Sequence, residues 1–409
     1  MFIPKNISPS ASSRSIDWLL FLALLPIMAS GLVTMYSFEQ GKNASCEQKT
    51  VGDETIISEG DECLTEIESP NLFFRKQLVW LFLSLTVFFI GSVIDWKFLR
   101  RSDVLLGLFL CGCGLLLLLF FLGTTRGIHG WLDLGVLNIQ PVEPVKLILI
   151  LAKYFSRRHI EIAHIRHILI SGFYAFVLFI LVLLQPDFGG ALVIAFIWFG
   201  MVMLSGISKK HFLTVLLIGA LSGLFLWAYV FKDYQKQRLF TFLHPLTDIR
   251  GTGYNAYQSM IAVGSGELLG KGVGYGTQSR LQFLPEYETD FIFAAFAEEW
   301  GFIGVLLLFL CYAIVIWRIL LSAMHGLSNF EILYGLGLAI LIMSHFIIHV
   351  GMNIGLLPVT GITLPFMSYG GTHTLTLFAG LGILMGMRRY KRTAHKDAIQ
   401  NEFLGVTAE

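Results

Sequence analysis

Long apolar runs alternate with short polar connections along almost the whole chain. Ten such runs occur, at about residues 18–38, 77–95, 103–122, 140–155, 168–184, 189–207, 212–231, 291–318, 331–350 and 373–387. Their lengths are close to the ~17–25 residues that a helix needs to cross a bilayer. The pattern therefore predicts an all-α integral membrane protein with about ten transmembrane helices and large extracytoplasmic loops. The run at 140–155 fits least well, because Glu143, Pro144 and Lys146 lie near its start.

Composition and charge agree with a membrane protein. Of the 409 residues, 55% are hydrophobic and only 14% are charged. The formal net charge is +1, so no overall electrostatic attraction draws the chain to nucleic acid. We therefore expect a membrane protein with no nucleic-acid partner.

The positions of lysine and arginine predict the orientation of the chain. They gather in alternate connections and at the end, as Lys97, Arg100, Arg101, Lys153, Arg157, Arg158, Arg166, Lys209, Lys210, Arg318, Arg388, Arg389, Lys391 and Arg392. Basic connections stay in the cytoplasm. This predicts a cytoplasmic segment 1–17, a membrane domain 18–387 and a cytoplasmic tail 388–409. The first run reads as a retained anchor, because it is long and no small-residue cleavage site follows it.

Three outward segments are large, at about residues 39–76, 232–290 and 351–372. The first contains Cys46 and Cys63, which form either a disulfide or two free thiols. The last is rich in Pro, Gly, Ser and Thr and cannot be one regular helix. It is either a surface loop or a re-entrant loop lining a pocket, since irregular backbone at membrane depth must be buried in protein or face a wet cavity.

The middle segment mixes charges with many glycines. Its candidate binding side chains are Arg238, Lys271, Arg280 and Glu286. The stretch "GSGELLGKG" is not a nucleotide-binding loop, because it lacks the first glycine and has Gly272 where Ser or Thr is needed. The glycines either let backbone N–H groups approach an anionic head group or make the loop flexible.

Five carboxylates lie in the stretch "FLPEYETDFIFAAFAEEWGF", residues 283–302, at the edge of an apolar run. A charge at the bilayer centre costs roughly 2.5–3.5 kcal/mol, so such residues usually line a cavity. Glu298 and Glu299 lie roughly 12–13 Å beyond Asp290 along a helix, too far to share a proton with it. We expect those two to line the pocket wall or to pack between helices, paired or protonated.

Four motifs resemble one family of membrane proteins. They are "QPVEPVK" (140–146), "QPDFGGALV" (185–193), "GYNAYQSMIAVGSGELLGKGVGYGTQSRLQFLPEYETDFIFAAFAEEWGFIG" (253–304) and "NIGLLPVTGITLPFMSYGG" (353–371). In this order and spacing the chain resembles the SEDS family (shape, elongation, division and sporulation). "GTQSRLQFLPE" (276–286) is more similar to its RodA branch than to the division-type FtsW members.

The resemblance implies an activity, partners and a location. It implies a ten-span peptidoglycan glycosyltransferase of the bacterial cytoplasmic membrane, which joins lipid II into β-1,4 glycan strands for cell elongation and shape. Its substrates would be lipid II and an undecaprenyl diphosphate-linked glycan. Its partners would be a class B penicillin-binding protein, which crosslinks the strands, and membrane proteins of the elongation machinery.

The resemblance also assigns candidate residues. Asp290 matches the proposed catalytic acid, a general base for the acceptor 4-hydroxyl, although Thr289 or Asp290 could instead cap the next helix. Glu143 and Lys146 are three residues apart, which from spacing alone indicates a structural ion pair. By resemblance Lys146 contacts diphosphate or balances the charge of the site, and Glu143 orients it. Asp187 is either a helix cap or a cavity residue. Ser368 is placed among the substrate-binding residues.

The reaction also limits the cofactors. Attack opposite the leaving diphosphate inverts the sugar, and the departing charge needs Lys146, Arg238, Lys271, Arg280 or a divalent cation. No cofactor is expected to be built in. His345 and His349 are four apart but lack the Glu of a zinc-protease motif, so we interpret them as packing or hydrogen-bonding residues.

The chain departs from the family pattern at four positions. Gly130 stands where an arginine is usual, and Arg126 is the candidate to take its place. Val142, Glu288 and Thr363 replace the usual Ser, His and Pro. Glu288 would raise the pKa of Asp290 if the two carboxylates approached.

Two other function classes remain open. One is a lipid II flippase or other precursor transporter, and the other is a non-catalytic scaffold for the crosslinking partner. The clustering of motifs on the outer face favours chemistry there.

Overall fold

The structure is a computed structural model. It describes residues 16–50, 72–121, 130–133, 138–151, 165–204, 207–231, 233–243, 253–281, 283–284, 286–326 and 328–403. The predictions for Cys46, Cys63 and Arg126 concern side chains outside this description.

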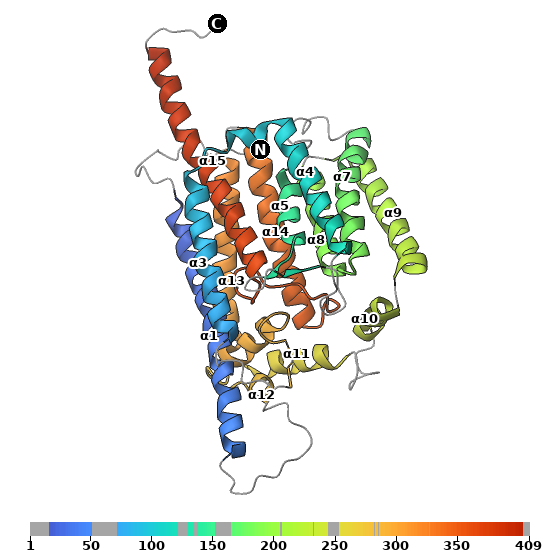
Figure 1. The fold of residues 1–409 in the computed structure, drawn as a ribbon, viewed down its shortest axis with the longest axis vertical. Coiled ribbons are helices and arrows are strands. Elements are labelled where there is room, and N and C mark those ends of the chain that lie inside the picture. The colour runs from blue at the N-terminus through green and yellow to red at the C-terminus, as the bar shows by residue number, and fades with distance from the viewer. Residues whose placement is uncertain are drawn as a thin grey trace.

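Each predicted apolar run forms a helix, and these helices stand side by side in one bundle (Figure 1). They are α1 (Trp18–Thr50), α3 (Leu72–Val93), α4 (Ser102–Leu118), α5 (Val142–Leu151), α7 (Ile165–Leu184), α8 (Phe188–Leu204), α9 (Lys209–Phe225), α13 (Ile292–Met324), α14 (Asn329–Asn353) and α15 (Gly371–Phe403). Within the described residues, six helices are long and apolar enough to cross a membrane, and two shorter apolar helices accompany them. The prediction of an all-α membrane bundle is confirmed.

The ends of two helices differ from the hydropathy pattern. Helix α1 continues to Thr50, inside the predicted outward loop, and α15 continues to Phe403, inside the predicted tail. Hydropathy marks only the apolar part of a helix, and polar residues that continue the helix lie outside that pattern. Both extensions project beyond the bundle at opposite ends (Figure 1).

The middle outward segment contains further short helices at one end of the bundle (Figure 1). They are α10 (Asp233–Leu243), α11 (Tyr254–Ser265) and α12 (Thr277–Arg280). Short single turns also occur, as η1 (Trp96–Arg100), η2 (Leu119–Phe121) and the π-helical η3 (Leu226–Val230). Two short strands, β1 (Leu132–Asp133) and β2 (Asn138–Ile139), pair antiparallel with Leu132 opposite Ile139.

The segment between α14 and α15 is irregular, and its second half is largely buried. Ile362, Leu364 and Phe366 have almost no exposed surface, and Leu357 and Pro358 line a groove. Of the two sequence interpretations, the pocket-lining loop is therefore correct and the simple surface loop is wrong. Its carbonyl groups find side-chain partners: His349 Nδ1 lies 2.7 Å from the oxygen of Ile362, and the Tyr312 hydroxyl donates to the oxygen of Pro365. These bonds satisfy backbone groups that lipid could not satisfy. We call residues 354–370 the buried loop.

A cluster of ion pairs links three helices at the end of the bundle opposite the short helices α10, α11 and α12. Arg318 of α13 and Arg388 of α15 both bind the buried carboxylate of Asp17, at 2.6 and 2.7 Å to Oδ2. Burial by itself raises the pKa of Asp17, but the hydrogen bonds from the two guanidinium groups and from the backbone of Leu20 hold that pKa below its usual value. The cluster joins the start of α1 to two other helices.

Candidate active site

Asp290 lies at the end of a tight turn that leads into α13. The carbonyl group of Glu286 accepts the backbone N–H groups of Thr289, Asp290 and Phe291, and Glu286 itself has a positive φ of 51°. Helix α13 begins at Ile292 with Phe291 as its N-cap residue, so Asp290 precedes the capping position. Glu286 is exposed, and its carboxylate accepts a hydrogen bond from the Thr289 hydroxyl at 3.1 Å.

Asn353, a residue that the sequence analysis did not single out, holds the backbone of Asp290. Its Nδ2 donates to the oxygen of Asp290 at 3.0 Å and to the oxygen of His349 at 2.8 Å. Its Oδ1 accepts from the N–H of Ala294 at 3.2 Å and from the hydroxyl of Ser259 at 3.2 Å. Because Asn353 is fully buried, this one amide joins α14, α11 and the start of α13.

Ser368 joins the buried loop to the same turn. Its hydroxyl donates to the oxygen of Thr289 at 2.9 Å and accepts from the N–H of Leu364 at 2.8 Å. The next residue, Tyr369, donates its N–H to the oxygen of Glu288 at 2.8 Å. Ser368 is buried and both hydrogen bonds of its hydroxyl are made within the protein, which indicates that it holds the turn and the loop together. Its contact with substrate stays a prediction.

Asp290 faces the buried loop at Gly361. A Cβ atom added to Gly361 would lie 3.6 Å from Oδ2 of Asp290, and the φ of +73° at this position also favours glycine. The two residues that follow, Ile362 and Thr363, are the ones whose carbonyl groups contact His349 and His345. The buried loop thus connects the Asp290 carboxylate with the histidines of α14.

Glu143 and Lys146 form the predicted ion pair on α5. Lys146 Nζ lies 2.7 Å from Oε1 of Glu143, and the two side chains are only 3% and 8% exposed. Lys146 Nζ also lies 3.3 Å from Nε2 of His345. This buried position, with two partners inside the protein, favours the role of charge balance for Lys146 over direct contact with diphosphate.

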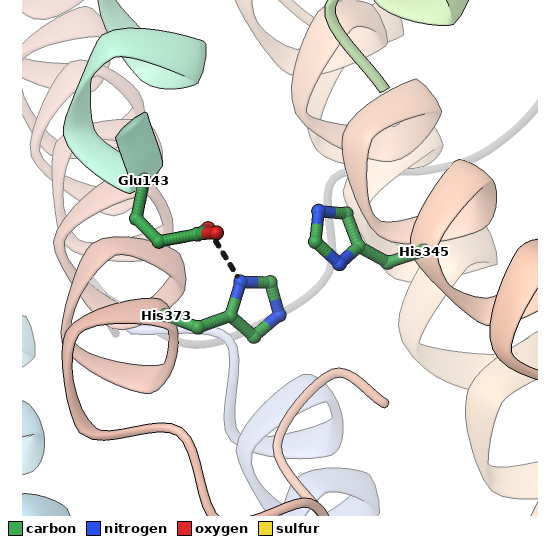
Figure 2. A group of neighbouring side chains, drawn as sticks. All are labelled: Glu143, His345 and His373. Carbon is green, nitrogen blue, oxygen red and sulfur yellow. Dashed lines mark hydrogen bonds and ion pairs between the residues drawn. The ribbon is translucent and has the colours of Figure 1, made fainter. Parts of the chain in front are cut away.

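His373 is a second member of the site that the sequence analysis missed. It comes from the first turn of α15, and its Nδ1 lies 2.7 Å from Oε2 of Glu143 (Figure 2). Its ring stacks on that of His345, with centroids 4.3 Å apart. Glu143, His345 and His373 together offer possible metal-ligand atoms that all lie within 4.8 Å of one another. Sequence spacing does not reveal this set, because its members come from three helices; polar residues within apolar runs were the available signal.

Asp187 caps the start of α8, which is one of the two roles that the sequence left open, and its role as a cavity residue stays a prediction. Its Oδ1 accepts the N–H of Gly190 at 2.7 Å, as a cap at the start of α8 does. Its carboxylate is also partly buried near the Glu143–Lys146 pair: burial raises the pKa of Asp187, and the nearby Lys146 charge offsets only part of that rise. The turn packs on the buried loop, since a Cβ on Gly189 would lie 2.7 Å from the oxygen of Thr360.

Lys271 is paired within the protein. Its Nζ lies 2.7 Å from Oε1 of Glu298, a fully buried carboxylate that also accepts the N–H groups of Thr277 and Gln278. The expectation that Glu298 packs with partners is confirmed. These bonds hold the glycine-rich segment onto α13, and a substrate role for Lys271 stays a prediction.

Glu299 also holds the glycine-rich segment against α13, at a position next to the one that Glu298 holds. It accepts hydrogen bonds from the Ser37 hydroxyl at 2.8 Å and the Gly274 N–H at 2.6 Å. Gly270 and Gly301 allow the close approach, because a Cβ on Gly301 would lie 2.2 Å from the nitrogen of Gly270. Glu299, like Glu298, therefore serves the packing of α13, as expected.

Arg238 is the exposed basic candidate. It lies on α10 at a groove of about 460 Å³, including the part open to solvent, with Thr241, Met260, Leu357 and Pro358 among the lining residues. The groove joins α10 and α11 to the buried loop and is mainly apolar. The side chain of Arg280 lies outside the described residues.

The positions that depart from the family pattern fit this packing. Val142 is fully buried at the start of α5, and Glu288 is buried beside Asp290 in the chain. The oxygen of Thr363 contacts His345 Nδ1 at 3.2 Å. The effect of these departures on activity stays a prediction, as does that of Gly130.

Comparison with known proteins places the chain in one family. A family model described as "Cell cycle protein", named for FtsW, RodA and SpoVE, matches residues 57–393. The peptidoglycan glycosyltransferase MrdB of Escherichia coli (strain K12) is 37% identical over 275 residues, which are 67% of this chain and 74% of MrdB.

Solved structures with the same fold cover nearly the whole chain. A chain from "Structural coordination of polymerization and crosslinking by a peptidoglycan synthase complex" has a TM-score of 0.71 and 27% identity, covering 92% of this chain and 98% of that one. The rod shape determining protein RodA of Thermus thermophilus has a TM-score of 0.61 and 25% identity, covering 91% and 96%. With its apolar helices and these matches, the chain is a multi-pass membrane protein that belongs to the FtsW/RodA/SpoVE family.

Proposed function

We propose that this protein is a peptidoglycan glycosyltransferase that polymerises lipid II into β-1,4 glycan strands during cell elongation. The main support is Asp290, whose backbone is held by Asn353 and whose carboxylate faces the buried loop. The name of E. coli MrdB states this enzyme class, and the RodA match supports the elongation branch.

Asp290 is the proposed general base. It would take the proton from the 4-hydroxyl of the acceptor sugar as that oxygen attacks the anomeric carbon of the donor. The bond to the undecaprenyl diphosphate then breaks on the opposite face, so an α-linked donor gives a β-linked product. A base held by buried hydrogen bonds keeps its position during attack, which is a large part of catalytic power.

The leaving diphosphate needs positive charge that the substrate can reach. Arg238 is exposed beside an apolar groove, which suits the border between a diphosphate and a polyprenyl chain. Lys146 is held by Glu143 and His345, so its charge would act from within the wall of the site. A divalent cation between substrate and protein is a further proposed source of charge.

The proposed partner is a class B penicillin-binding protein, with other membrane proteins of the elongation machinery. The structural match to a chain of a polymerising and crosslinking peptidoglycan synthase complex supports this partner. The basic connections support an orientation with both termini in the cytoplasm of a bacterial cell and with Asp290 at the outer face.

The test is strand formation from purified lipid II by the protein with its crosslinking partner in liposomes. Asp290→Asn keeps the shape of the side chain but removes the base, and we expect a folded protein without polymerase activity. The exposed acid of α4 provides a matched control, Asp103→Asn, which should behave as wild type. Full activity of Asp290→Asn would exclude Asp290 as the base. A folded wild type that makes no strands would favour the flippase or the scaffold.

A further inference from the structure

The Glu143 carboxylate is bound by one residue of its own helix and by one residue of a second helix. Lys146 of α5 binds Oε1 and His373 of α15 binds Oε2, each at 2.7 Å, and His345 of α14 contacts Lys146 from the other side. Figure 2 shows the three side chains converging, with the His373 ring next to both the Glu143 carboxylate and the His345 ring. All four residues are buried, with exposed fractions of 6% or less for the residue as a whole. None of the sequence motifs singled out His373.

The partners fix which ring nitrogens carry protons. His345 Nδ1 lies against the carbonyl oxygen of Thr363, which can only accept, so Nδ1 carries the proton and Nε2 accepts from the Lys146 ammonium. His373 Nδ1 lies against a carboxylate oxygen and likewise donates. His345 is therefore a neutral imidazole that accepts from the ammonium, and Glu143 and Lys146 form the ion pair of the cluster. Within the described residues, Nε2 of His373 has no hydrogen-bond partner.

This charge count decides between a metal ion and a lysine as the cation of the cluster. The ligand atoms of Glu143, His345 and His373 lie within 4.8 Å of one another, which alone suggests a metal site. Lys146 Nζ already contacts two of these three residues and balances the single negative charge. A divalent ion added beside it would leave a net charge of about +2 in a buried region, which is strongly unfavourable. The ammonium takes the place of the metal.

We propose that His373 is a positioning residue, which fixes the Glu143 carboxylate so that Lys146 stays between Glu143 and His345. The effect on activity depends on the proposed polymerase function. Without the His373 N–H, Oε2 would lose its donor, and the ammonium would be drawn toward both carboxylate oxygens and away from His345.

Three substitutions separate the hydrogen bond from the volume of the ring. His373→Asn keeps an N–H donor at the place of Nδ1, His373→Gln moves the donor to the place of Nε2, and His373→Leu removes it. We expect His373→Asn to retain activity within about threefold, whereas His373→Leu and His373→Gln lose roughly 10–100-fold in kcat with little change in KM, as expected for a misplaced group. Thermal unfolding of each variant in detergent identifies any that misfold.

A second measurement reports the position of Lys146 without any polymerase activity. An amine-reactive reagent such as acetic anhydride, read out by mass spectrometry on the full chain, should label buried Lys146 slowly relative to exposed Lys97. In His373→Leu we expect roughly ten- to hundredfold faster labelling of Lys146, because its ammonium moves away from His345 and loses that hydrogen bond, which is worth about this factor for a charged group. In His373→Asn the labelling should stay at the wild-type rate.

The outcomes are distinct. Unchanged labelling and activity in His373→Leu, or equal losses in the Asn and Leu variants, would overturn the proposal. A tightly held metal ion in the wild type that is absent from His373→Leu would overturn it in favour of a metal centre. If no variant and no wild type makes strands, the proposed function fails, but the labelling pattern still decides the role of His373.

Discussion

Asn353 offers the sharpest test of how the fold positions Asp290. Its amide donates to the oxygens of Asp290 and His349 and accepts from the N–H of Ala294, all in a fully buried place. Asn353→Asp keeps the size of the side chain but replaces the two donated hydrogens with an oxygen that faces two carbonyl oxygens. Asn353→Ala removes the group altogether.

The expected decrease in the free energy of unfolding follows from the hydrogen bonds that are broken. In Asn353→Ala the carbonyl group of Asp290 and the N–H of Ala294 lose their bonds to the amide, at about 1–3 kcal/mol for each buried group, or roughly 2–6 kcal/mol in all. Asn353→Asp keeps the hydrogen bond from the N–H of Ala294 but adds repulsion between the new carboxylate oxygen and the carbonyl oxygens of Asp290 and His349. We therefore expect its free energy of unfolding to decrease by an amount in the same range. Activity should fall about 100-fold, because a shift of about 1 Å in a catalytic group has that effect.

Thermal unfolding and strand formation from lipid II, measured on the same preparations, provide the assay. Asn329→Asp at the exposed start of the same helix is the control, since an acid there is favourable to the helix dipole. If Asn353→Asp unfolds at the wild-type temperature and polymerises at the wild-type rate, Asn353 does not hold Asp290 and the reasoning is wrong.

Two predictions concern ion pairs elsewhere. The pKa of Asp17 is lowered in the folded protein, so the Asp17 carboxylate stabilises the fold at pH values above its ordinary pKa of 3.8. This stabilisation is lost as the pH falls through the lowered pKa of the folded state. Asp17→Asn should therefore lower the melting temperature at pH 7, and the melting temperature of the variant should decrease less than that of the wild type when the pH falls below about 4. Lys271→Met leaves buried Glu298 without its cation and should destabilise the protein by roughly 3 kcal/mol, the low end for a broken buried pair because backbone N–H groups still bind the carboxylate. An unchanged melting temperature with a raised KM would instead assign Lys271 to substrate.

The sequence predicted the helices well because lipid imposes a strong rule on composition. Every apolar run became a helix, and even the short run with Glu143 and Lys146 did so, since the two charges neutralise each other on one helix face. The polar extensions of α1 and α15 were missed, because they lie outside the apolar pattern on which the prediction depended.

The partners within the site could not be predicted in the same way. His373 and Asn353 act on residues 230 and 63 positions away, and no periodicity along one helix states which other helix lies against it. For Lys271 the sequence suggested a ligand where the structure shows an internal partner. A basic residue in a glycine-rich outward loop suggests a phosphate contact, but the Lys271 ammonium binds the carboxylate of Glu298. The distinction depends on the fold of the loop back onto α13.

The buried loop explains why folding and chemistry use the same residues here. An irregular backbone at membrane depth needs hydrogen-bond donors for its carbonyl groups, and His345 donates to Thr363 from Nδ1. That bond commits the proton of His345 to Nδ1, so Nε2 is left to accept from Lys146. The shape of the loop thus fixes the tautomer, the tautomer fixes the second partner of the ammonium, and the ammonium balances Glu143. Since Gly361 of the same loop faces Asp290, a change in the loop backbone should disturb the base and the ionic cluster together.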